Sequence, residues 1–253
     1  MTNYKESMNP SEKVKYISNW IKSYVDQMPS KAESLVIGIS GGIDSSVSST
    51  LSAMTGLKTI VLSMPIKQKE NQHDLSLKHK DWLVKNFKNV EAHNISLDKL
   101  FEEFSSTLNK FDNEHGFANS RARLRMTTLY QVAASNNGIV VGTGNKVEDF
   151  GVGFYTKYGD GGVDISPIAD CTKSQVWEMG KNLGILKEII EAQPTDGLWD
   201  DGRTDVNQLG MSYKELEEAM KDSSDKNHKK YLEIRKRNLH KMNPAPVCKM
   251  KDD

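Results

Sequence analysis

Short, continuous runs of apolar residues alternate along the chain with longer segments whose apolar residues recur every three or four positions. The short runs are typical of strands that are buried on both faces, and the longer segments have the period of amphipathic helices. Strands are predicted at 35–39, 58–64, 90–95 and 138–144, with 165–168 as a short edge strand. Because strand, helix and strand follow one another as βαβ units, the pattern predicts an α/β fold. We expect an open, mainly parallel sheet of about five strands with helices on both faces.

The same periodicity organises the rest of the chain. An amphipathic helix is predicted at 10–28, where Asn9 can cap the helix and Pro10 occupies its first turn. Further helices are predicted at 43–54, 70–87, 97–111, 116–136, 172–183, 211–220 and 226–239. We interpret residues 1–253 as a single domain. It would contain the N-terminal helix, an α/β core at about 34–190, and a mobile loop with a C-terminal helical segment at about 194–253.

A loop rich in glycine and serine connects the first predicted strand to the helix after it. Its sequence is Gly38-Ile39-Ser40-Gly41-Gly42-Ile43-Asp44-Ser45-Ser46. Its three glycines let the backbone turn sharply and approach a ligand, and its hydroxyls add donors at a helix N-terminus, which favours anions. The loop therefore predicts a phosphate site. It lacks the lysine of a Walker loop, and Ile43 stands where the dinucleotide fingerprint requires glycine.

Asp44 is the unexpected residue of this loop. A bare carboxylate about 4 Å from a phosphate charge costs roughly 4 kcal/mol at an effective dielectric constant of 20. A metal ion between the two charges removes this cost, so Asp44 is a candidate ligand of magnesium. The alternative is that Asp44 only caps the helix and that the glycines only form a tight turn.

Two more residues are expected at the same edge of the sheet, because ligands of open α/β sheets bind at the carboxyl ends of the strands. Thr143 belongs to the end of the strand at 138–144, which places it on the rim that carries Ser40. Glu148 follows five residues later. By itself it would be an ordinary surface acid. Beside Asp44 it is a candidate second carboxylate for magnesium, which takes carboxylates together with phosphate oxygens.

Basic side chains indicate an anionic ligand. On the helix at 116–136, Arg121 and Arg125 share one side while Arg123 points across, so at least one of them is expected to meet an anion. Lys173 lies in the first turn of a helix, where a lysine is unfavourable without an anion beside it. The glycine-rich stretch at 157–164 carries charged residues at both ends. Taken by itself, it is typical of a surface turn.

Composition argues against several classes of protein. Lys+Arg and Asp+Glu number 34 each, so the formal net charge is +0, and no basic field favours nucleic-acid or membrane binding. Cys171 and Cys248 are the only cysteines, which suits reduced thiols better than a disulfide framework or a zinc site. The N-terminus has no apolar signal core, and no run reaches the ~18 apolar residues of a membrane span. We expect a soluble, cytoplasmic protein.

The stretch Ser40-Gly41-Gly42-Ile43-Asp44-Ser45-Ser46 after a strand resembles the loop of the PP-loop ATP pyrophosphatases, which cleave ATP to AMP and pyrophosphate. Within that superfamily, the chain resembles the ammonia-dependent NAD synthetases from about Leu35 to about Pro246. The stretches that carry this resemblance are 121–126, 141–143 with Glu148, 154–164, 172–173, 194–195 and 240–241. The resemblance implies a Rossmann-like, adenine nucleotide alpha hydrolase-like fold whose nucleotide-binding core is at about 34–190.

Site residues follow from the resemblance by position. The ATP site would consist of Gly38, Ile39, Ser40, Gly41, Gly42, Ile43, Asp44, Ser45, Thr143, Lys173 and Thr195. Magnesium would be held by Asp44 and Glu148. Asp44 and Lys173 would stabilise charge in catalysis, with no covalent nucleophile. Deamido-NAD would be contacted by Arg123, Lys157, Asp164, His240 and Lys241.

One departure from the familiar bacterial pattern lies between Thr143 and Lys157, where the chain is one residue longer. The usual Asp-His is replaced there by Gly144-Asn145-Lys146. The path of the loop between Glu148 and Lys157 is therefore not predicted.

The resemblance implies a ligase for the last step of NAD biosynthesis. Deamido-NAD would be adenylated by ATP and then amidated by ammonia, giving NAD, AMP and pyrophosphate. The chain has no room for a glutaminase domain and lacks a reactive-cysteine signature, so free ammonia, or ammonia delivered by another protein, is the expected donor. The resemblance also implies a homodimer with deamido-NAD near the subunit interface.

Two alternatives remain open at this point. The first is another AMP-forming ligase of the PP-loop superfamily, such as the synthetase part of a split GMP synthetase, which the stretch at 157–164 disfavours. The second is a non-catalytic nucleotide-binding module similar to the universal stress proteins. Such a module has little use for Asp44 and Glu148 together.

Overall fold

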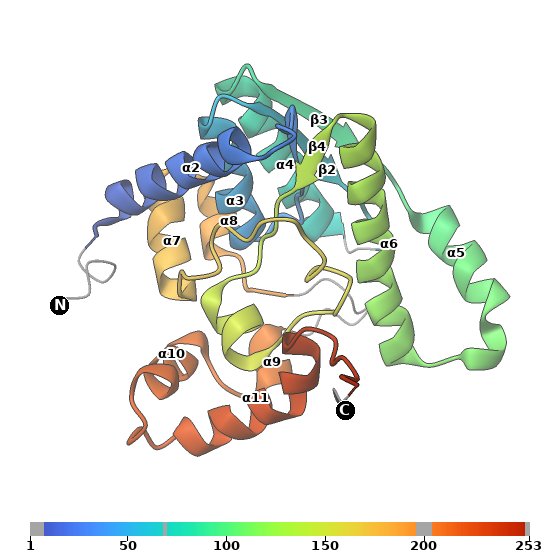
Figure 1. Cartoon of the computed structure of the whole chain (residues 1–253), viewed down its shortest axis with the longest axis vertical. Coiled ribbons are helices and arrows are strands. Elements are labelled where there is room, and N and C mark those ends of the chain that lie inside the picture. The colour runs from blue at the N-terminus through green and yellow to red at the C-terminus, as the bar shows by residue number, and fades with distance from the viewer. Residues whose placement is uncertain (1–7, 68–69, 196–203, 251–253) are drawn as a thin grey trace.

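Four parallel strands form one open sheet in the computed structural model, which describes residues 8–67, 70–195 and 204–250 (Figure 1). The strands are β1 (Ser34–Gly38), β2 (Lys58–Ser63), β3 (Val90–Asn94) and β4 (Gly138–Val140), in the order β3-β2-β1-β4. The predicted parallel α/β fold is confirmed, but about five strands was wrong. Ile165 makes only an isolated parallel bridge to Val141. β4 ends at Val140, so no neighbouring strand extends beside the rest of 165–168.

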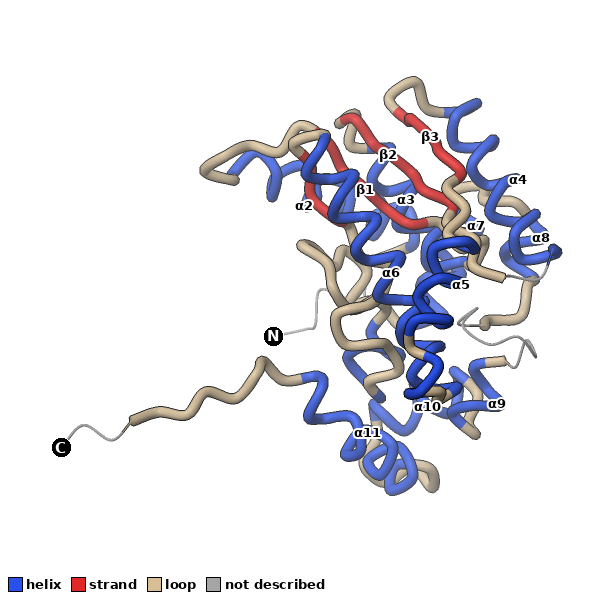
Figure 2. The backbone as a smooth tube through the Cα atoms, turned by 90° about the vertical axis from the view of Figure 1, so that its right-hand side faces the viewer, coloured by secondary structure: helices blue, strands red, loops and turns tan. Residues whose placement is uncertain are grey.

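The sheet is covered on both faces, because successive residues of a strand point to opposite sides. Leu35 and Ile37 pack on one face, whereas Val36 packs on the other together with Ile60 and Leu62. The first face is covered by α2 (Pro10–Gln27), α3 (Ile43–Met54), α4 (Glu70–Asn86), α7 (Lys173–Asn182) and α8 (Lys187–Glu191). The second is covered by α5 (Asp98–Thr107) and α6 (Glu114–Ser135) (Figure 2).

The strand order places a ligand crevice between β1 and β4. The chain leaves β1 toward β2 on one side, and returns after β3 through α5 and α6 to β4 on the other. In open α/β sheets, ligands bind at such a reversal of strand order, outside the carboxyl ends of the strands. The loop after β1 and the turn after β4 therefore meet at this crevice.

One predicted helix is confirmed and another is interrupted. The N-terminal helix is confirmed as α2, with Asn9 and Glu12 forming a reciprocal capping box. The helix predicted at 97–111 is interrupted: α5 ends at Thr107, and a 3-10 turn η1 (Asn109–Phe111) follows. Of its apolar stripe, Phe101 is buried, but Phe111 is 77% exposed.

A group of short helices lies below the carboxyl edge of the sheet as drawn in Figure 1. It consists of the π-helix η2 (Lys146–Val152), α9 (Asp205–Leu209), α10 (Tyr213–Lys221) and α11 (His228–Met242). These elements share a hydrophobic cluster that includes Val147, Leu209 and Leu216. The helices predicted at 211–220 and 226–239 are thus present. The loop expected to move falls largely at 196–203, outside the described residues. No helix in the described part of the chain is long and apolar enough to cross a membrane.

A buried histidine joins α4 to α3. His79 is fully buried, and its Nε2 lies 3.0 Å from Oγ of Ser49 in α3. Its ring stacks on Trp82 with centroids 5.7 Å apart. Burial disfavours the imidazolium form and lowers the pKa of His79 to about 4.

Acidification from pH 7 to pH 5 is therefore expected to destabilise the chain through His79. In the unfolded chain a histidine binds a proton below about pH 6.5, whereas folded His79 stays neutral down to about pH 4. The unfolded state binds more protons in this window, so the free energy of unfolding should fall by about 2 kcal/mol. Urea denaturation at both pH values would measure the fall.

The variant His79→Gln should lose most of this pH dependence. The matched control is His93→Gln, because the His93 side chain is 46% exposed. If His79→Gln and the wild type lose the same stability between pH 7 and pH 5, other groups carry the effect.

Candidate active site

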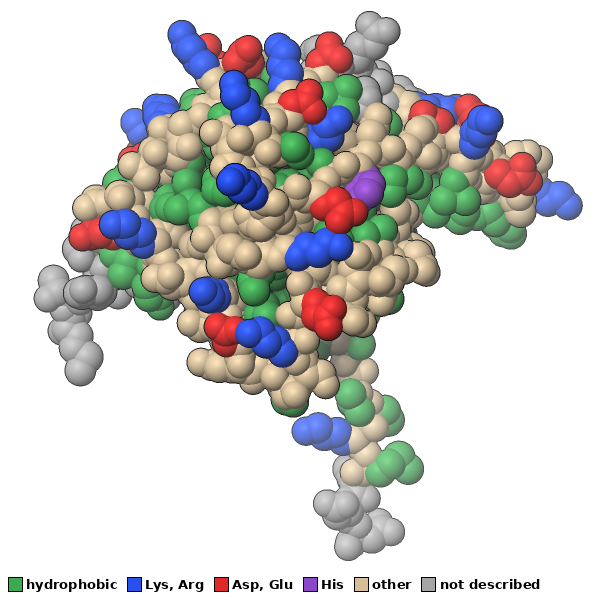
Figure 3. Space-filling view, turned by 90° about the horizontal axis from the view of Figure 1, so that it is seen from above, with side chains coloured by type: hydrophobic (Ala, Val, Ile, Leu, Met, Phe, Trp, Pro, Cys, Tyr) green, Lys and Arg blue, Asp and Glu red, His purple; other side chains and the backbone are tan. Residues whose placement is uncertain are grey.

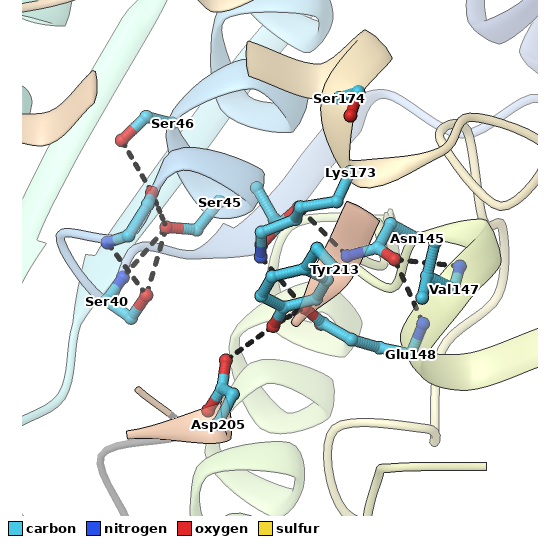
Figure 4. A network of polar contacts seen from close by, with 12 residues as sticks. Ser40, Ser45, Ser46, Asn145, Val147, Glu148, Lys173, Ser174, Asp205 and Tyr213 are labelled. Atoms are coloured by element: carbon cyan, nitrogen blue, oxygen red, sulfur yellow. Dashed lines mark hydrogen bonds and ion pairs between the residues drawn. The ribbon is translucent and has the colours of Figure 1, made fainter. Parts of the chain in front are cut away.

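The loop after β1 is tied together by its own hydroxyls. Gly41 has φ +87°, a left-handed conformation that favours glycine. The Ser45 hydroxyl accepts a bond from the Ser40 backbone N–H at 3.1 Å and donates to the Gly42 carbonyl at 3.0 Å. The Ser46 hydroxyl donates to the same carbonyl at 2.9 Å (Figure 4). The loop is therefore held in shape by its own bonds at the N-terminus of α3, where the helix dipole favours an anion.

A lysine bridges the two carboxylates predicted to hold magnesium. Lys173 Nζ lies 2.6 Å from Asp44 Oδ2 and 2.8 Å from Glu148 Oε1 (Figure 4). The Lys173 side chain is 2% exposed, and those of Asp44 and Glu148 are 17% and 15% exposed. The Asn145 side chain connects Asp44 to the backbone at Glu148. Its amide donates to Asp44 Oδ1 at 3.1 Å, and its carbonyl accepts from the backbone N–H groups of Val147 and Glu148.

The charges in this cluster do not balance. Burial opposes the charged form of Lys173, but Asp44 and Glu148 outweigh it and raise the pKa of the lysine. The pKa of Asp44 is also raised, because burial and the neighbouring Glu148 outweigh Lys173. Two carboxylates share one ammonium group, so an additional cation would be favourable here.

Tyr213 closes the cluster from the C-terminal helices. Its hydroxyl lies 2.5 Å from Glu148 Oε1 and 2.7 Å from Asp205 Oδ2. Burial and the two carboxylates raise the pKa of the phenol, so it stays protonated. In Figure 4, Tyr213 stands between Glu148 and Asp205.

The predicted ATP and magnesium residues line one cavity of about 280 Å³. Its walls include the whole loop from Gly38 to Ser45, together with Thr143, Glu148, Lys173 and Thr195. Asp205 lines it as well. The structure therefore brings together residues that lie far apart in the sequence, at the crevice between β1 and β4.

The five residues expected to contact deamido-NAD do not line this cavity. Arg123 is exposed, and its Nε donates to the Lys157 carbonyl at 3.3 Å. Asp164 accepts bonds from the Val140 N–H and the Tyr130 hydroxyl, at 2.7 and 3.1 Å, so it braces the end of β4.

At the end of α11, His240 is exposed, whereas Lys241 Nζ donates to the Tyr155 carbonyl at 2.7 Å. None of these five side chains lines the cavity that the loop at 38–45 forms among the described residues.

The stretch between Thr143 and Lys157 contains a π-helix. Lys146–Val152 forms a π-helix, the conformation that accommodates one extra residue within a helical turn. Gly153 ends it in the left-handed region with φ +72°, and the Phe154 N–H returns to the Glu148 carbonyl at 2.8 Å. The path that the sequence left open is thus a compact turn that keeps Glu148 beside Lys173.

A second cavity, of about 250 Å³, adjoins the first and shares Gly144, Asp149 and Asp160 with it. Tyr155 and Leu239 contribute to its far wall. Burial, and then the carboxylates of Asp160, Glu148 and Asp44, raise the pKa of Asp149 well above its ordinary value. A Cβ at Gly144 would meet the Asp149 carboxylate, so a larger residue there would require that side chain to shift.

Three residues of the cluster were missed in the sequence. Asn145 was noted only as a departure from the bacterial pattern, although its place directly after the turn at the end of β4 was a usable signal. Asp205 lies in the segment at about 194–253 that was expected to contain a mobile loop, and nothing in the sequence links it to Tyr213. Tyr213 follows Ser212, the cap of α10, and nothing around it in the sequence marks a contact with Glu148.

Comparison with known proteins gives a consistent family. A family model described as NAD synthase matches residues 13–252. The NH(3)-dependent NAD(+) synthetase of Carboxydothermus hydrogenoformans is 36% identical over 216 residues, which cover 83% of this chain and 85% of that protein. The enzyme of the same name from Sulfurisphaera tokodaii is 38% identical over 205 residues, covering 81% and 71%.

Solved structures agree on the fold. The NMN synthetase from Francisella tularensis superimposes with a TM-score of 0.88 at 34% identity, covering 96% of this chain and 100% of that one. The NH3-dependent NAD synthetase from Campylobacter jejuni gives a TM-score of 0.77 at 23% identity, with the same coverage, and shows the fold alone.

Proposed function

This chain belongs to the NAD synthase family, and on that premise we propose that it amidates deamido-NAD with ammonia at the expense of ATP, giving NAD, AMP and pyrophosphate. The observation that carries the proposal is the meeting of Asp44, Glu148 and Lys173 in one cavity with the phosphate loop. A phosphate loop alone occurs in many nucleotide-binding proteins. The additional cluster of Asp44, Glu148 and Lys173 favours a protein that cleaves a polyphosphate. Neither a GMP synthetase-type ligase nor a stress-protein-type module is favoured by the family.

The chemistry requires activation of a carboxylate, which does not react with ammonia on its own. An oxygen of the nicotinate carboxylate attacks the α-phosphorus of ATP, and the bond to the bridging oxygen of pyrophosphate breaks. Ammonia then adds to the acyl carbon, the nitrogen loses a proton, and AMP leaves with the electron pair of the C–O bond. No side chain forms a covalent bond. The loop and Lys173 hold the phosphates and stabilise the charge that develops on them.

Asp44 and Glu148 are the residues that would hold magnesium. Carboxylate oxygens are its preferred protein ligands, and the cluster carries more negative than positive charge. When bound, magnesium would neutralise charge on the leaving pyrophosphate. We further propose that Thr143 and Thr195 contact ATP, as their place in the cavity wall supports.

Deamido-NAD is proposed to bind across a homodimer interface, through Arg123, Lys157, Asp164, His240 and Lys241. Exposure of Arg123 and His240 outside the cavity supports this, because exposed side chains are accessible to a partner subunit and to a ligand bound between the subunits. Figure 3 shows hydrophobic side chains on the arm that projects to the right, the side on which α5 lies in Figure 1. Leu100 of α5 and the adjacent Phe111 are 51% and 77% exposed, as expected of an interface.

We also propose that residues 1–253 act as one domain, in the cytoplasm, on small molecules rather than on nucleic acid. The formal net charge of +0 supports the choice of partner. Sedimentation of the purified protein would test the homodimer independently of activity.

The decisive assay mixes the purified protein with ATP, magnesium, deamido-NAD and ammonium chloride. We expect AMP, pyrophosphate and NAD in equal amounts, and none of the three when deamido-NAD is omitted. If ATP binds but neither AMP nor pyrophosphate appears, the synthetase proposal fails and a binding module takes its place.

A second candidate acceptor is the mononucleotide, nicotinate mononucleotide, whose amide is NMN. It is favoured by the likeness to the Francisella NMN synthetase, which covers 96% of the chain at 34% identity. The chemistry would be the same, with a smaller acceptor. The two acceptors are separated by their kcat/KM values in parallel reactions. Our proposal requires the higher value for deamido-NAD, and the reverse order would assign the chain to NMN synthesis.

A further inference from the structure

Tyr213 is buried at the point where the C-terminal helices meet the charged cluster. It is the first residue of α10, and it is 5% exposed. Its hydroxyl oxygen lies 2.5 Å from Glu148 Oε1 and 2.7 Å from Asp205 Oδ2, and its single proton can be donated to one of the two carboxylates at a time. No strand of the sheet carries Tyr213, so it reaches the site from the C-terminal helices.

The ring of Tyr213 is fixed separately from its hydroxyl. It meets Trp177 edge to face, with centroids 5.8 Å apart at 89°. Lys173 Nζ lies 4.7 Å from the ring centroid on the way to the carboxylates, close enough for a cation–π contact. The ring also belongs to the hydrophobic cluster that includes Leu216. Packing therefore aims the hydroxyl, and a phenylalanine would keep all of these contacts.

Glu148 depends on this hydroxyl for its orientation. Its backbone N–H donates to the Asn145 side-chain carbonyl. Its Oε1 accepts hydrogen bonds from Lys173 Nζ and from the Tyr213 hydroxyl. These two donors on Oε1 hold the Glu148 carboxylate in one orientation. If Lys173 turns toward a bound phosphate, the Tyr213 hydroxyl still restrains Glu148.

Asp205 connects the same hydroxyl to the wall of the ATP cavity. It heads α9, lines the cavity, and its backbone N–H donates to the Pro194 carbonyl at 3.1 Å, next to Thr195. Tyr213 therefore joins a carboxylate proposed to bind metal to the segment that carries a residue proposed to bind ATP.

We propose that Tyr213 is a positioning residue, whose hydroxyl, lying between Glu148 and Asp205, holds the Glu148 carboxylate in the orientation that binds the divalent cation of the nucleotide. This inference rests on the proposed function only in taking that cation to be held by Asp44 and Glu148. Tyr213 would act through Glu148 and would not touch the substrates itself.

The test is binding of Mn²⁺ to the protein with a non-hydrolysable ATP analogue, followed by the electron paramagnetic resonance of free Mn²⁺. Tyr213→Phe is expected to raise the Mn²⁺ dissociation constant about tenfold, the equivalent of about 1.4 kcal/mol. In the assay, the same variant should need about tenfold more Mg²⁺ for half-maximal rate, while kcat at saturating Mg²⁺ stays within about twofold of wild type. The matched control is Tyr231→Phe, a tyrosine that is 8% exposed in the same helical cluster. It should leave Mn²⁺ binding unchanged.

A double-mutant cycle separates positioning from general packing. In the background of Glu148→Gln, Tyr213→Phe should weaken Mn²⁺ binding no further, because the group it orients has been altered. Asp205→Asn removes the second carboxylate beside the Tyr213 hydroxyl while keeping Tyr213, and is expected to weaken Mn²⁺ binding about threefold. This variant tests the inference if Tyr213→Phe does not fold.

Wild-type Mn²⁺ affinity in Tyr213→Phe would overturn the inference, as would an equal loss in the Glu148→Gln background. These outcomes are distinct from failure of the proposed function. That failure would appear as wild-type protein that forms no NAD, and Mn²⁺ binding with the analogue would still report on Tyr213.

Discussion

Replacing Lys173 with methionine is expected to lower kcat/KM by about 10²–10³-fold, the usual cost of removing one preorganised charge-stabilising group. The same change should destabilise the folded chain by about 3–5 kcal/mol, because it removes one partner of a buried ion pair. Lys173 is 2% exposed and lies within 2.8 Å of both carboxylates, so its loss leaves Asp44 and Glu148 facing each other. Methionine keeps most of the volume of the lysine side chain, so Lys173→Met removes the charge without opening a large cavity.

Steady-state release of AMP and urea denaturation at pH 7 would measure the two effects. The matched control is Lys181→Met, an exposed lysine on the same helix α7, which should change neither. Activity within tenfold of wild type in Lys173→Met would show that the lysine only neutralises the carboxylates and does not assist the reaction.

Replacing Asp44 with asparagine should lower the activity without lowering the stability of the folded chain. Activity is expected to fall by about 10²–10³-fold, because a carboxylate proposed to hold magnesium is lost. Stability at pH 7 should stay the same or rise. The pKa of Asp44 is raised by burial and by Glu148, so its charged form is disfavoured in the folded chain, and the neutral amide avoids that cost. Lys173 keeps Glu148 as its partner.

The same two measurements apply, with Asp170→Asn as the control, since the Asp170 side chain is 56% exposed. If Asp44→Asn loses as much stability as Lys173→Met, the cluster does not carry the excess negative charge inferred from its contacts.

Much of the fold, and the meeting of the predicted residues in one cavity, was predictable because the signals are local. Apolar runs identified the four strands, and the residues after β1 and β4 had to meet at the carboxyl edge of a parallel sheet. Glycines and serines between β1 and α3 predicted the phosphate loop. The fifth strand was wrong because a short apolar run such as 165–168 does not reveal whether a neighbouring strand extends beside it.

The remaining contacts were not predictable because they depend on how distant segments pack. Lys173 was expected near an anion, but its place between Asp44 and Glu148 depends on how α7 packs beside η2. Tyr213 reaches Glu148 only because α10 packs on the same hydrophobic cluster as Val147. No local pattern in the sequence encodes either distance.

The central strand β1 obtains its second neighbour late in the synthesis of the chain. β2 follows it closely, but β4 begins only at Gly138, after α5 and α6 have been made. Until then, the edge of β1 that pairs with β4 presents unpaired N–H and C=O groups beside Leu35 and Val36, which are both fully buried in the folded protein. An open apolar edge is a template for pairing with other chains. A nascent chain on the ribosome, or a fragment that stops before Gly138, is therefore exposed to edge-to-edge aggregation, and this risk ends when β4 is added.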